Sequence, residues 1–237
     1  MNIPCIGSIP KTSKEEDYLL NEQSSLTQYT DYYEDLAEQL FVFLKTQGLK
    51  SALITSPFFN ENHQYIVPNI GYCLSQYMGH STLIVDANFN NPHFQKIYSI
   101  KDGKGLTNKI NINNINNTIS KINDGPDIIL TDHFIDSPST VIKKIDLKSI
   151  INQLKNDYEA ILIDATSVNN TKDASLIAEC TDGLVLVIDE GKLQREMLKN
   201  SLPRFRRNDV KIIGSILNNR TFPIPEFIYR RFKYFID

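Results

Sequence analysis

The chain has few cysteines, no long apolar run and no large excess of charge. Its three cysteines, Cys5, Cys73 and Cys180, are odd in number and far apart. This spacing indicates neither a disulfide framework nor a metal knuckle, so we expect three buried thiols in a reducing compartment. No apolar stretch approaches the roughly 20 residues of a membrane span, and the N-terminus lacks a signal-peptide pattern. The net charge of −3 gives no indication of nucleic acid, and we expect a cytoplasmic protein that binds none.

The composition is that of an ordinary folded protein with one sizeable core. Of its 237 residues, 41% are hydrophobic and 22% charged, which is typical of a single α/β domain. Residues 1–30 are polar and acidic and contain two prolines, so we expect an extended N-terminal arm. We expect the domain to cover residues 31–220 and a tail helix to cover residues 221–237.

Short β-branched runs alternate with helical stretches after residue 50. The runs are apolar throughout, which is typical of strands that are covered on both faces. Their order predicts a doubly wound, mostly parallel sheet flanked by helices in three αβα layers. A helix is predicted at 32–46, and an Asn- and Ile-rich surface segment, either a helix or a loop pair, at 101–123. The predicted strands are 52–55, 82–86, 128–131, 160–164, 184–189 and 211–217.

The segment after the first predicted strand stands where a phosphate-binding loop would stand. Such a loop, G-x-x-x-x-G-K-S/T, needs glycines for close approach, a lysine for phosphate and a hydroxyl for Mg²⁺. Those four places hold Pro57, Asn62, His63 and Gln64. His63 is shorter than lysine and lacks its fixed charge, which forfeits a contact of about 1.5–3 kcal/mol. The sequence therefore predicts that the loop no longer binds phosphate.

Pro68 is a second defect of this site. A phosphate-binding helix begins directly at its loop, so that its first N–H groups face the anion. Because proline is favoured at the first helical position, we expect the helix to run from near Val67 to about Met78. Residues 60–66 would then be irregular chain.

Two aspartates close neighbouring predicted strands at the edge where ligands bind in such sheets. Asp86 and Asp164 could hold Mg²⁺ or its waters there. An aspartate at this position also caps the turn that follows a buried strand. Because the ligands of the phosphate loop are missing, we favour the structural role and expect no metal site.

The ordered set of motifs resembles the bacterial tyrosine kinases of capsule and exopolysaccharide export, which are deviant-Walker P-loop ATPases. The resemblance covers about residues 32–220. It rests on the first strand and loop, an Asn on the next helix and two Walker-type strands that end in Asp86 and Asp164. Smaller matches follow in order: Asn69, Lys104-Gly-Leu106, Asp173-Ala174, Thr181-Asp-Gly-Leu-Val-Leu-Val187, Gly191-Lys192 and Arg195-Glu196. The resemblance implies a P-loop NTPase-like fold.

The departures from the family fall on its catalytic positions. The loop's two glycines, lysine and Ser/Thr correspond to Asn60, Asn62, His63 and Gln64. The second acid and the two arginines of the next motif are replaced by Asn88, Asn90 and Asn91. Since the strands stay apolar while this one site changes, we interpret the chain as a pseudokinase. We expect no catalytic residue and no cofactor, with Asn60, Asn62, His63 and Gln64 as a vestigial loop.

The resemblance implies an accessory or regulatory role in polysaccharide synthesis and export, at the inner face of the membrane. Its partner would be a membrane chain-length regulator (co-polymerase) or an active kinase paralogue. The family forms rings through a Glu/Arg pattern on its first helix, where this chain has Asp31, Glu34 and Ala37. A homo-oligomer built in that way is not expected, whereas another kind of homo-oligomer stays open.

Two other functions stay open as alternatives to a pseudokinase. The first is an active tyrosine kinase or ATPase that uses ATP and Mg²⁺ in an unorthodox site with His63, Asp86 and Asp164. The second is a partitioning-type factor on DNA or membrane, for which only the basic C-terminal part argues. The tail, which holds only Tyr229 and Tyr234 of the family's tyrosine cluster, could be an amphipathic docking segment, but we favour a terminal helix packed on the domain.

Overall fold

A single eight-stranded sheet organises the protein. The computed structural model describes residues 3–11, 19–20, 28–57, 61–100, 105–106, 113–131, 138–167, 173–191, 203, 205 and 210–221. The strand order is β1-β8-β7-β2-β6-β3-β5-β4. Neighbouring strands are parallel except for the antiparallel pair β4 and β5. The strands are β1 (Cys5–Pro10), β2 (Ser51–Thr55), β3 (Thr82–Asp86), β4 (Ile119–Ser120), β5 (Asp127–Ile129), β6 (Ala160–Asp164), β7 (Gly183–Asp189) and β8 (Ile212–Arg220).

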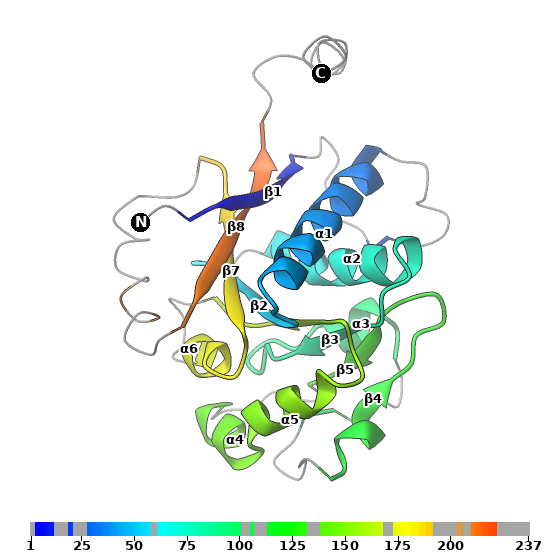
Figure 1. Cartoon of the computed structure of the whole chain (residues 1–237), viewed down its shortest axis with the longest axis vertical. Coiled ribbons are helices and arrows are strands. Elements are labelled where there is room, and N and C mark those ends of the chain that lie inside the picture. The colour runs from blue at the N-terminus through cyan, green and yellow to red at the C-terminus, as the bar shows by residue number, and fades with distance from the viewer. Residues whose placement is uncertain are drawn as a thin grey trace.

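Helices cover both faces of the sheet, with α1 and α2 on one face and α4, α5 and α6 on the other (Figure 1). Alternate residues of the central strands pack into opposite layers: Ile54 joins the cluster under α1, and Leu53 joins the cluster under α5. The predicted three-layer α/β fold is therefore confirmed. The helices are α1 (Gln28–Thr46), α2 (Ile66–Tyr72), α3 (Phe94–Ile97), α4 (Pro138–Lys144), α5 (Leu147–Leu154) and α6 (Asp173–Ala178). Single turns of other types are the 3₁₀ helices η2 (Glu61–Tyr65) and η4 (Ile115–Thr118) and the π-helix η3 (Cys73–Tyr77).

The six predicted strands all exist, but both ends of the sheet differ from the prediction. Residues 5–10 are extended, as an arm would be, yet they pair with β8 as the edge strand β1. Helix α1 begins at Gln28, four residues earlier than predicted. In the segment 101–123, β4 was not predicted, because two residues are too short to show a strand pattern. Residues 222–237, including the predicted tail helix, Tyr229 and Tyr234, lie outside the described residues.

The chain between β2 and β3 is more helical than predicted. The prediction of irregular chain at 60–66 is wrong, since residues 61–65 form η2 and α2 begins at Ile66. Pro68 is the third residue of α2, inside the first turn, where its missing N–H breaks no bond within the helix. Gly71 lets α2 lie against the sheet, because a Cβ there would come within 2.8 Å of the Ile84 side chain.

The cysteines differ from the prediction of three buried thiols. Cys73 is buried, Cys180 is partly buried and Cys5 is exposed. The exposure of Cys5 follows from its place at the start of an edge strand. Within the described part of the chain, no helix combines the length and apolarity needed to span a bilayer.

The docking of β1 can be tested with a small core deletion. Ile9 is 2% exposed and belongs to the same apolar cluster as Leu36 of α1. Replacing Ile9 with valine should lower the free energy of unfolding by about 1 kcal/mol, because it removes one buried methyl group. Urea denaturation measures this loss, with the exposed Cys5→Ser as the control that should change nothing. Equal stability of the two variants would show that β1 is not docked in solution.

Candidate functional site

A polar hollow opens where β2, β6 and β3 end, at the edge of the sheet where ligands were expected. The three strands are neighbours in the sheet, and Asp86 at the end of β3 is in register with Asp164 at the end of β6. The hollow is lined by Ser56, His63, Gln64, Asn88, Asn91, His93, Asp164, Ala165, Thr166 and Ser167.

Only some of the predicted loop residues can be placed at this site. His63 and Gln64 line the hollow. Asn60 lies outside the described residues, and of Asn62 only the backbone, within η2, is described. Asn69, which matches a family position on the following helix, is buried, and its side-chain oxygen accepts a hydrogen bond from the Leu20 N–H at 2.9 Å. In this chain Asn69 therefore ties the N-terminal segment to α2.

His63 is held by a carboxylate that the sequence analysis did not identify. Its Nε2 lies 2.9 Å from Oδ1 of Asp189, at the end of β7. The same oxygen accepts hydrogen bonds from the side-chain amides of Asn218 and Asn219 at 2.9 and 3.1 Å. The side chain at the predicted lysine position is thus tied to one of the protein's own acids.

Asp86 holds the turn after β3, as predicted. Its carboxylate accepts hydrogen bonds from three backbone N–H groups: Asn88 at 3.0 Å, His93 at 3.2 Å and Phe94 at 3.3 Å. The side chain is fully buried. Burial raises the pKa of Asp86, while His93 and the three N–H groups oppose that rise.

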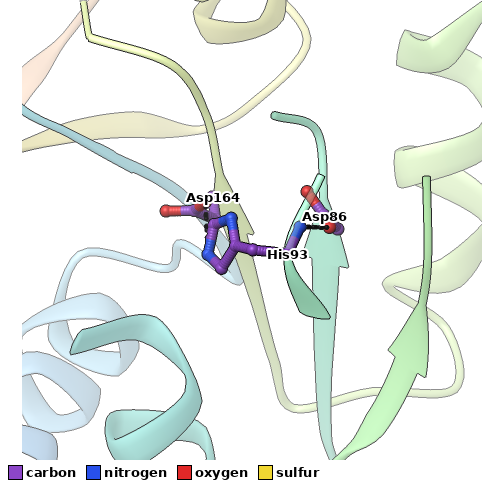
Figure 2. A group of neighbouring side chains, drawn as sticks. All are labelled: Asp86, His93 and Asp164. Carbon is purple, nitrogen blue, oxygen red and sulfur yellow. Dashed lines mark hydrogen bonds and ion pairs between the residues drawn. The ribbon is translucent and has the colours of Figure 1, made fainter. Parts of the chain in front are cut away.

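Asp164 has no comparable set of donors. Its Oδ2 is buried and has no hydrogen-bond partner among the described residues, and the same holds for Nε2 of His93. The two atoms are 3.6 Å apart (Figure 2). Burial raises the pKa of Asp164 to about 7, with His93 lowering it and Asp86 raising it further. The predicted capping role therefore holds for Asp86, whereas Asp164 shows no such bond.

His93 is a second residue near this site that was not identified from the sequence. It follows β3 by seven residues in a loop, and no spacing signal distinguishes it from a surface histidine. The turn held by Asp86 brings its ring between the two aspartates (Figure 2). Beside it, the Thr166 hydroxyl donates a hydrogen bond to the side-chain oxygen of Asn88 at 2.7 Å.

The described lining of the hollow contains no fixed positive charge. None of its ten lining residues is a lysine or an arginine. Its acids are Asp164 in the lining and Asp86 directly behind it. Phosphate sites rely on lysine, arginine or helix-terminal N–H groups, and acids without a bound cation repel phosphate.

Known proteins resemble this chain in both sequence and structure. The putative tyrosine-protein kinase CapB of Staphylococcus aureus is 28% identical over 172 residues, which is 72% of this chain and 75% of that protein. The chain belongs to the bacterial tyrosine kinase family of capsule and exopolysaccharide biosynthesis. No protein-family model matches it.

Two solved structures share the fold of this chain. The chimerical protein CapA2B2 superposes with a TM-score of 0.79 at 21% identity, covering 93% of this chain and 96% of that one. The kinase domain of the Escherichia coli tyrosine kinase ETK gives 0.78 at 14% identity, covering 94% and 93%. These structures confirm the P-loop NTPase-like fold that the motifs predicted.

Proposed function

We propose that this member of the tyrosine kinase family is a pseudokinase that serves capsule or exopolysaccharide biosynthesis as an accessory or regulatory protein. One observation carries the proposal: among the described residues, the hollow at the ends of β2, β3 and β6 is lined by no lysine or arginine, and it keeps the buried Asp86 and the partly buried Asp164. The bond between His63 and Asp189 supports it, because the residue at the lysine position is engaged within the protein. ATP would bind weakly or not at all.

The proposed partner is a membrane chain-length regulator or an active kinase of the same family, and the proposed location is the cytoplasmic face of the membrane. The similarity to CapA2B2, a chimera whose name joins CapA to CapB, supports a partner of the first kind. Co-purification of the tagged chain with membranes from cells that have or lack the regulator tests this part. Equal recovery from both would contradict it.

The absence of nucleotide binding is tested by calorimetric titration with MgATP and MgADP. We expect no heat of binding up to millimolar nucleotide, whereas an intact kinase of the family, as the positive control, should bind about 10³-fold more tightly. This difference corresponds to two or three lost charge-assisted contacts of about 1.5–3 kcal/mol each. Micromolar, Mg²⁺-dependent binding that Asp86→Ala or Asp164→Ala abolishes would contradict the proposal and favour an active kinase or ATPase.

A further inference from the structure

Three side chains with metal-ligating atoms converge at the floor of the hollow. Asp86 ends β3, Asp164 ends β6, and His93 lies in the segment that connects β3 to α3. One ligand atom from each lies within 4.8 Å of the others (Figure 2). In the part of the chain that the structure describes, no second cluster of this kind occurs.

The hydrogen bond on the far side of the His93 ring fixes which nitrogen can bind a metal. Nδ1 lies 3.1 Å from the backbone oxygen of Asn91. A carbonyl oxygen only accepts, so Nδ1 carries the hydrogen, and in the neutral ring Nε2 presents a lone pair. Histidines that bind metals typically donate their other N–H to a backbone carbonyl or carboxylate in this way.

The lone pair of Nε2 faces an atom with which it forms no hydrogen bond. At 3.6 Å, Nε2 and Oδ2 of Asp164 are too far apart for one, and both atoms are buried without a partner among the described residues. Two ligand atoms at about 2.0–2.2 Å from one cation lie roughly 3–4 Å apart. The separation of the two atoms therefore fits a pair of ligands on one metal ion.

Asp86 can supply the third ligand without giving up its role in the turn. An ionised carboxylate has about four lone-pair positions, and three of these accept the N–H groups of Asn88, His93 and Phe94. The position that is left can face the other two side chains.

We propose that Asp86, His93 and Asp164 bind a divalent transition metal, Mn²⁺ or Zn²⁺, in the absence of any nucleotide. An imidazole nitrogen among the ligands favours these ions over Mg²⁺, which prefers oxygen ligands and keeps its waters. A bound cation would also keep both buried acids charged, against the burial that raises the pKa of each. This proposal goes beyond the proposed function, because a chain that binds no nucleotide can still bind this metal.

The experiment titrates metal into chelator-treated full-length protein without nucleotide. Mn²⁺ is the first probe, because it avoids the thiol of the exposed Cys5, and electron paramagnetic resonance counts the bound ions. We expect one Mn²⁺ per chain, displaced by Zn²⁺, and binding of Mg²⁺ that is about tenfold weaker or more. Failure of Mn²⁺ and Zn²⁺ to bind would overturn the proposal.

Single substitutions test which side chains bind the metal ion. His93→Gln and Asp164→Asn should each weaken Mn²⁺ binding by roughly 10–100-fold. His80→Gln is the matched control, because His80 also lies beside a carboxylate, 3.3 Å from Glu159, but near the surface. Equal affinity of His93→Gln and His80→Gln would overturn the proposal.

A measurement on the unaltered protein guards against variants that fail to fold. Substoichiometric Mn²⁺ should broaden the NMR signals of the His93 ring well before those of His80, since paramagnetic broadening falls steeply with distance. Broadening of both rings at the same ratio of metal to protein would show binding elsewhere.

Discussion

Asp164→Asn should make the protein more stable above pH 7 when divalent metal is removed by a chelator. Asp164 has its pKa raised by burial from an ordinary 3.8 to about 7. The native state therefore binds a proton more tightly than the unfolded state, and stability is lost as the pH rises from about 4 to about 7. The rise in pKa between the unfolded and the native state corresponds to a loss of about 4 kcal/mol in the free energy of unfolding. Asparagine, which never ionises, avoids this loss.

The measurement is urea denaturation of both proteins from pH 4.5 to pH 8 in the presence of chelator. The gain in stability should be small at the acidic end and should reach its full size near pH 8. Parallel stability curves for the two proteins would show that Asp164 does not ionise with a raised pKa.

Asp182→Asn is a control for which we expect the opposite change in stability. Burial alone would raise the pKa of Asp182, but hydrogen bonds from Lys155 and from the backbone of Lys50 and Ser51 bring it below its usual value. A lowered pKa contributes stability that is present at neutral pH and is lost as the pH falls through the folded-state value. Asp182→Asn should therefore destabilise the protein at pH 8, where Asp164→Asn stabilises it.

The central strands could be predicted from sequence because their apolar runs are a local signal. The inner residues of β2, β3 and β6 are buried, and all of them are apolar: Ala52–Ile54, Leu83–Val85 and Ala160–Ile163. Strand β1 gives no such signal, since only Ile6 and Ile9 of its six residues are buried. Its pairing with β8 joins segments about 200 residues apart, and no local pattern records that contact.

The site could be located from sequence, but its chemistry could not. Strand ends pointed to Asp86 and Asp164, and the register between β3 and β6 places them side by side. The contacts of His93 and Asp189 depend on loop geometry and strand order, which a lone histidine or aspartate in a sequence does not reveal. The sequence thus located the two aspartates, and the structure adds the histidine and the carboxylate that lie near them.

The structural role of Asp86 predicts a large loss of stability for Asp86→Ala. Alanine leaves the buried N–H groups of Asn88, His93 and Phe94 without their acceptor. Each unsatisfied donor costs about 1–3 kcal/mol, and removing a carboxyl that burial disfavours offsets part of the sum. We expect a net loss of about 3 kcal/mol in the free energy of unfolding at neutral pH, measured by urea denaturation with chelator present.

Asp86→Asn separates the hydrogen-bonding role of this side chain from its charge. The amide keeps one oxygen acceptor of the same shape, so it can satisfy at most two of the three N–H groups and should cost less than alanine. Asp157→Ala, at an exposed aspartate, is the control and should change stability by less than about 0.5 kcal/mol. If Asp86→Ala were as stable as this control, the turn after β3 would not depend on Asp86. If Asp86→Asn kept most of the stability but lost Mn²⁺ binding, the same carboxylate would serve both the turn and the metal.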